Sequence, residues 1–86
     1  MSIARIFELA KTATDAELVW LWYKVSKGSL QALTNTSPAF LHDCMMFHRL
    51  YGKKVVAIIC DWHEQGHRHE EMIESVEEMM TARLET

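Results

Sequence analysis

Long apolar runs are absent from this sequence. The two longest, at residues 18–23 and 55–60, fall far short of the roughly 20 apolar residues that a membrane span needs. The N-terminus carries an acidic residue, Glu8, and no small-residue cleavage site, which is unlike a secretory signal peptide. Only two Cys are present. These features predict a cytoplasmic protein with reduced thiols and no membrane contact.

The patterns of an active site or a DNA-binding surface are also missing. No Gly-rich turn precedes a Ser, and no loop has the composition that cradles a phosphate. Residues 1–54 carry seven Lys/Arg against four Asp/Glu, whereas residues 55–86 carry two against eight. The C-terminal part is therefore acidic, and no basic cluster elsewhere compensates. We expect a non-enzymatic protein without a cofactor, for which direct nucleic-acid binding is disfavoured.

Apolar side chains, by contrast, are plentiful for a chain of this size. Eighty-six residues form a single domain (1–86), and such a short chain buries only about 60–65% of its unfolded surface. Yet 49% of the residues are hydrophobic, including three Trp, three Phe and six Met. One small monomer cannot hide this much apolar surface, so the composition favours an obligate oligomer.

The first part of the chain predicts two helices. Residues 3–11 place their apolar side chains on one face and form a short helix. Residues 14–17, Thr-Asp-Ala-Glu, then match a capping box for a second helix over residues 15–27. Gly28 either ends this helix or is tolerated within it, and the apolar period favours continuation to Leu33.

A third helix is predicted after residues 34–38, the clearest break in the sequence. Ser37 is expected as its N-cap and Pro38 as its first helical residue. The helix runs to Leu50 or Tyr51, and Gly52 is expected to stop it. No Pro follows Pro38.

Residues 54–84 predict one long C-terminal helix. Their apolar residues recur at a spacing of three and four, as in a helix that buries one stripe against other helices. About 30 residues at 1.5 Å each give a rod of roughly 45 Å, too long for one small core to cover. We therefore predict an all-α domain of about four helices, assembled as a dimer or tetramer. The expected oligomer seam is Ile59, Trp62, Ile73, Val76 and Met80. The alternative, a strand over the β-branched residues 55–59, needs a second strand for pairing and is disfavoured.

Trp20 is predicted to lie in a polar stripe of the second helix, with Glu17, Lys24 and Lys27 at helical spacing. A Trp on a solvent-facing stripe costs solubility unless something covers it. The cover is either a second copy, the N-terminal helix, or another protein for which Trp20 is a hot spot.

Met45 and Met46 raise the same question on the third helix. They project away from its apolar face, which is formed by Phe40, Cys44, Phe47 and Tyr51. Met adapts to irregular surfaces, so the pair belongs either to the oligomer core or to a second contact surface. The predicted partner-binding residues are therefore Trp20, Lys24, Lys27, Met45 and Met46.

Two Cys-His pairs suggest a metal hypothesis. An antiparallel hairpin of the last two helices would place Cys44 and His48 opposite Cys60 and His63, a set that zinc accepts. Residues 63–67 also spell H-E-x-x-H, the motif of zinc peptidases, which need a third ligand and a substrate cleft. The spacing is not that of a zinc finger, and packing of two buried thiols explains it. We predict no metal site, with a zinc-stabilised module as an alternative.

The sequence resembles small antirepressor proteins of temperate bacteriophages. The resemblance lies in the compact acidic helical chain, in an exposed Trp20 with Met45 and Met46, and in the missing catalytic and DNA-reading elements. That resemblance implies an oligomer that captures a transcriptional repressor directly and needs no cofactor. Besides the zinc-stabilised module, a DNA-associated regulator remains as a third hypothesis.

Overall fold

The described residues form four helices in the computed structural model, which describes residues 3–35 and 38–85, with side chains in the first range up to Gly28. The helices are α1 (Ile3–Ala10), α2 (Asp15–Asn35), α3 (Pro38–Glu64) and α4 (His69–Glu85). No described residue lies in a strand, so the all-α prediction is confirmed, including helix at residues 55–60. The predicted N-cap Ser37 lies outside the described residues. No helix of the described part is long and apolar enough to span a membrane.

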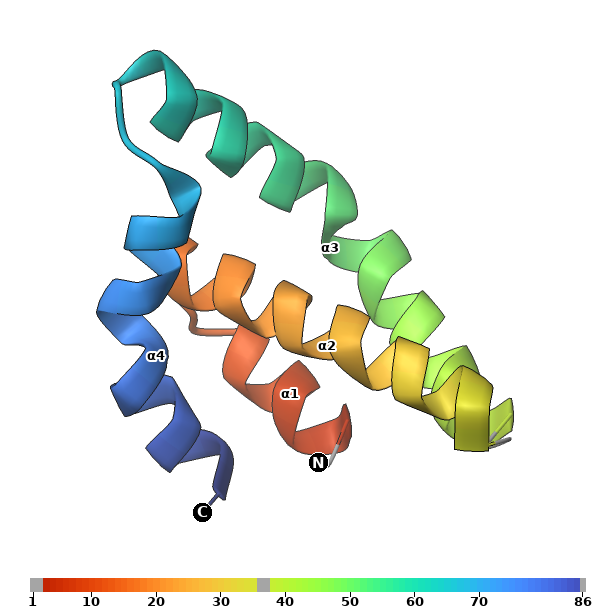
Figure 1. The fold of residues 1–86 in the computed structure, drawn as a ribbon. Coiled ribbons are helices and arrows are strands. Elements are labelled where there is room, and N and C mark those ends of the chain that lie inside the picture. The colour runs from red at the N-terminus through yellow and green to blue at the C-terminus, as the bar shows by residue number, and fades with distance from the viewer. Residues whose placement is uncertain (1–2, 36–37, 86) are drawn as a thin grey trace.

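Helix α2 is the centre of the fold. It packs between α3 and α4 and also contacts α1, as Figure 1 shows. Phe7 of α1 meets Phe47 of α3 edge to face, with ring centroids 5.2 Å apart. The buried apolar side chains come from all four helices and form one core: Ile6, Ala10, Leu18, Val19, Trp20, Leu21, Val25, Cys44, Phe47, Val55, Ile58, Trp62 and Met80.

The start of α2 is fixed by the predicted capping box. The Thr14 backbone N–H donates to Oε1 of Glu17 at 3.2 Å, and the Glu17 N–H donates to Oγ1 of Thr14 at 3.4 Å. These reciprocal bonds satisfy donors that the first helical turn leaves free. The helix then passes through Gly28 and ends at Asn35, which confirms the favoured continuation.

Helix α3 does not stop at Gly52, so that prediction is wrong. It is continuous for 27 residues, about 40 Å at 1.5 Å per residue. Its core side chains continue at a spacing of three and four on both sides of the glycine: Phe47, Tyr51, Val55, Ile58 and Trp62. Burial of these side chains outweighs the roughly 1 kcal/mol that a mid-helix Gly costs.

The predicted long C-terminal helix is broken at Gly66, so that prediction is also wrong. Gly66 has a φ of 80°, a left-handed conformation that suits glycine. Its N–H donates to the carbonyl of His63 at 3.1 Å, and the His67 N–H donates to the carbonyl of Trp62 at 2.8 Å. This pair of bonds is a Schellman motif, which ends α3 and lets α4 turn back against α2 (Figure 1).

The return of α4 covers the predicted oligomer seam within the same chain. Trp62 and Met80 are buried, and Ile59, Ile73 and Val76 are half-buried against the same core. The described part of the chain therefore has no uncovered rod of roughly 45 Å that would require an oligomer. Self-association remains a prediction that needs a different surface.

Candidate functional site

Trp20 is buried, with 1% of its surface exposed, so the prediction that it lies on a solvent-facing stripe is wrong. Helix α4 lies over it. The indole N–H donates to Oε2 of Glu77, and Lys24 Nζ lies 5.1 Å from the centroid of the ring. Because Trp20 is covered, it offers no surface to a partner in this conformation.

Glu77 joins two residues of α2 to α4. Besides accepting the Trp20 N–H, its carboxylate lies 3.5 Å from Lys24 Nζ. The hydrogen bond from Trp20 is the main cause that lowers the pKa of Glu77, and Lys24 and Lys27 lower it further, while desolvation opposes them. The carboxylate is therefore held in its charged form.

Glu17 makes a second polar contact between the same helices. Arg83 Nη1 of α4 lies 3.7 Å from Oε1 of Glu17, which is buried. Two ion pairs thus join α2 to α4. Glu17 of α2 pairs with Arg83 of α4, and Lys24 of α2 pairs with Glu77 of α4. Along the sequence the acid precedes the base on both helices, by seven residues on α2 and by six on α4, so antiparallel packing pairs opposite charges; this matched spacing is the sequence signal for a cover over Trp20.

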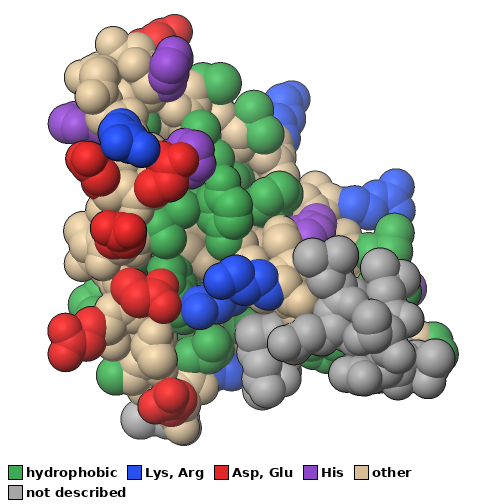
Figure 2. Space-filling view, in the orientation of Figure 1, with side chains coloured by type: hydrophobic (Ala, Val, Ile, Leu, Met, Phe, Trp, Pro, Cys, Tyr) green, Lys and Arg blue, Asp and Glu red, His purple; other side chains and the backbone are tan. Residues whose placement is uncertain are grey.

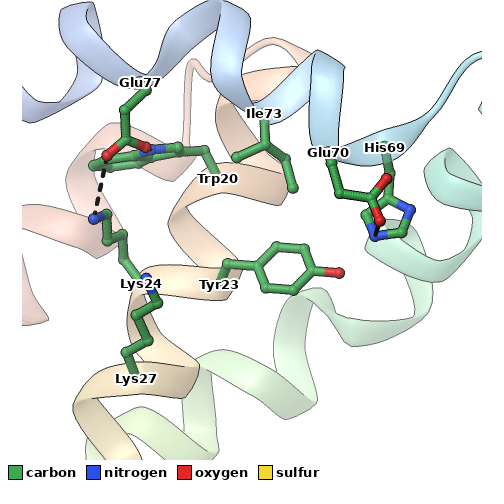
Figure 3. Close-up of a pocket in the computed structure, with 8 residues that line it drawn as sticks. All are labelled: Trp20, Tyr23, Lys24, Lys27, His69, Glu70, Ile73 and Glu77. Atoms are coloured by element: carbon green, nitrogen blue, oxygen red, sulfur yellow. Dashed lines mark hydrogen bonds and ion pairs between the residues drawn. The ribbon is translucent and has the colours of Figure 1, made fainter.

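A groove of about 270 Å³ lies between α2 and α4, beside the Trp20 contact. Figure 3 shows Lys24 and Lys27 toward one end and Glu70 with His69 toward the other. Tyr23 and Ile73 lie between the two ends. Glu77 lies beside Lys24 at the first end, so that end carries two bases and one acid, the middle is apolar, and the far end carries the acid Glu70. Figure 2 shows the same contrast on the surface: acidic side chains follow α4, hydrophobic ones fill the hollow beside it, and basic ones lie over α2.

The outer side of α3 carries the most exposed hydrophobic side chains in the described part of the protein. Met45, Met46, Leu50 and Val56 are 55%, 48%, 64% and 58% exposed. The prediction that Met45 and Met46 point away from the core is therefore confirmed. Arg49 and Lys53 are exposed among them. These six residues are called the α3 outer face below.

The hairpin that the zinc hypothesis requires does not exist. Cys44 with His48 and Cys60 with His63 lie on one continuous helix, about 24 Å apart along its axis at 1.5 Å per residue. Cys44 is buried and Cys60 is exposed, so the expectation of two buried thiols holds only for Cys44.

The H-E-x-x-H sequence is split by the turn at Gly66, so its two His residues do not share one helical face. Cys60, His63 and His67 line a second hollow, of about 560 Å³, where α3 passes into α4. Among the described residues, no three His, Cys, Asp or Glu side chains are grouped as metal ligands would be.

The described residues thus form four helices, with an exposed apolar face on α3 and a bipolar groove between α2 and α4. Comparisons of the chain with protein-family models, with curated proteins and with solved structures found no match.

Proposed function

We propose that this protein is a non-enzymatic binding protein that captures another protein with the α3 outer face. The supporting observation is the exposure of four large hydrophobic side chains on one side of a single helix. Apolar side chains gathered in this way mark interaction sites on soluble proteins. Two of them are Met, whose flexible thioether chains adapt to irregular partner surfaces.

The charges within the α3 outer face indicate what the partner surface carries. Arg49 and Lys53 lie among the hydrophobic side chains and are exposed. A complementary surface therefore combines an apolar contact with acidic side chains around it. Charge complementarity of this kind speeds association and rejects basic surfaces.

Within this class, the partner we propose is a transcriptional repressor, so that the protein acts as a cytoplasmic phage antirepressor. The acidic exposed side of α4 supports this role. Glu71, Glu74 and Glu78 are exposed there. These charges give the complex of protein and repressor an acidic surface, which repels DNA phosphates and disfavours rebinding of the operator.

The test compares capture by the wild type with capture by a Leu50→Asp/Val56→Asp variant, in lysates of bacteria that carry temperate phages. Met79→Asp is the matched control, because Met79 is an exposed hydrophobic residue on α4, away from α3. We expect the wild type and the control to retain a repressor that the double variant loses. The wild type should then release that repressor from operator DNA in a gel shift. Equal capture by the double variant would contradict the proposed surface.

A further inference from the structure

We propose that the α3 outer face of one copy docks into the α2/α4 groove of a second copy. The contact places Met46 and Leu50 of one chain against Tyr23 and Ile73 of the other. This inference concerns self-association; because a repressor would use the same α3 outer face, a second copy and a repressor compete for it.

The size and lining of the groove favour protein side chains as its occupant. Its volume of about 270 Å³ is just below the roughly 300–1,000 Å³ of sites for drug-sized ligands. Its apolar middle accepts hydrophobic side chains, and its two ends carry opposite charges. Lys27 is exposed at one end of the groove, where it attracts Glu77 of its own chain and can also meet an acid of a second copy.

One stripe of α3 carries side chains that complement the groove; it combines three residues of the α3 outer face with Asp43. Asp43, Met46, Leu50 and Lys53 follow each other at a spacing of three, four and three, so they lie on one side of the helix. The order along the helix is acid, apolar, apolar, base. Asp43 is half exposed, and the other three are exposed.

The two orders match when the stripe lies along the groove. Asp43 then faces Lys27, Met46 and Leu50 face Tyr23 and Ile73, and Lys53 faces Glu70. The stripe spans about 15 Å between its charged residues, and the groove spans about 10 Å from Glu70 to Glu77 with Lys27 reaching beyond. Long side chains at both ends bridge the difference.

Each chain has one stripe and one groove, so the contact is head-to-tail and can close as a ring. If each of two chains inserts its stripe into the groove of the other, the assembly is a dimer.

The test uses two charge reversals of exposed residues, Lys53→Glu on the stripe and Glu70→Lys in the groove, followed by sedimentation over a concentration series. We expect the wild type to sediment above its 10.0 kDa monomer mass. Each variant alone brings like charges together and should raise the dissociation constant by about tenfold or more. An equimolar mixture should associate again, because the acid introduced at position 53 of one variant then meets the base introduced at position 70 of the other.

Matched controls are Glu71→Lys, a neighbouring residue that does not line the groove, and Lys11→Glu in the turn after α1. Both should associate like the wild type, and melting curves should show that all variants fold. A wild type that stays monomeric at every concentration overturns the proposal, as do single variants that associate normally or a mixture that fails to associate. Glu70→Lys leaves α3 intact, so capture of a repressor should survive in it even where self-association is lost.

Discussion

The indole N–H of Trp20 donates to the carboxylate of Glu77, 57 residues further along the chain. The other oxygen of the same carboxylate lies 3.5 Å from Lys24 Nζ. One acidic side chain of α4 therefore holds two residues of α2. This contact turns a polar stripe of α2 into part of a helix–helix interface.

Replacement of Trp20 by Ala should destabilise the fold strongly. The side chain is buried, and removal of a buried Trp typically costs about 3–5 kcal/mol because it leaves a cavity. Urea unfolding followed by circular dichroism measures the change. Met45→Ala, at an exposed position, is the control and should stay within about 0.5 kcal/mol of the wild type. A Trp20→Ala variant as stable as this control would show that α4 does not cover Trp20 in solution.

The stability of the protein should fall in acid, in part because of Glu77. The hydrogen bond from Trp20, with help from Lys24 and Lys27, holds the pKa of Glu77 below its ordinary value in the folded state. The unfolded chain therefore takes up a proton at higher pH than the folded chain does. The stabilisation is complete above the ordinary pKa of glutamate and is lost as the pH falls through the lowered value.

Glu77→Gln removes this titration and provides the comparison. Unfolding free energies of the wild type and the variant, measured by urea titration at a series of pH values, should converge as the pH falls. If the unfolding free energies of the two proteins differ by the same amount at every acid pH, Glu77 does not cause the loss of stability in acid. Glu74→Gln, on the exposed side of the same helix, is the matched control.

Local sequence patterns predicted those parts of the fold that local interactions determine. The capping box at Thr14 and Glu17 needs only residues of one turn, and Pro38 begins α3 where it was expected. Core positions of α3 also follow directly from helical spacing. Met45 and Met46 were correctly placed outside the core because they interrupt that spacing.

The two glycines show why the helix boundaries were not predictable from composition. Gly52 has buried core residues on both sides along α3, with Phe47 five residues before it and Val55 three after it, so tertiary packing stabilises a helix through it. Gly66 is followed by exposed His67 and Arg68, whose packing cannot offset the cost of a helical Gly.

Trp20 was misplaced for a similar reason. Its polar neighbours on α2 are covered by residues of α4 with opposite charge, and these lie more than 50 residues away. Hydrophobic periodicity within one helix does not contain that information. The groove between α2 and α4, the central element of the proposed self-association, was missed together with this contact.

Replacement of Gly52 by Ser should stabilise the protein more than replacement by Ala. The indole N–H of Trp22 is buried and has no hydrogen-bond partner among the described residues. A Cβ at position 52 would lie 3.9 Å from Trp22 Nε1, so a Ser hydroxyl there is within reach to accept this N–H. A satisfied buried donor contributes about 1 kcal/mol. Thermal or urea unfolding measures the difference between the two variants, and Trp22→Phe should abolish it.

The last prediction contrasts Gly52 with Gly66, because the same substitution should have opposite effects at the two positions. Gly52 lies inside α3, and a Cβ there makes ordinary contact, so Gly52→Ala should stabilise by about 0.5–1 kcal/mol. Gly66 has a φ of 80° with nothing within 4 Å of an added Cβ, so Gly66→Ala suffers from backbone strain alone. It should destabilise by about 1–2 kcal/mol. Gly66→Asn should fall between glycine and alanine, because Asn tolerates the left-handed conformation. Urea unfolding of the four proteins decides the matter: a Gly66→Ala variant that gains stability would indicate that α3 and α4 form one continuous helix in solution.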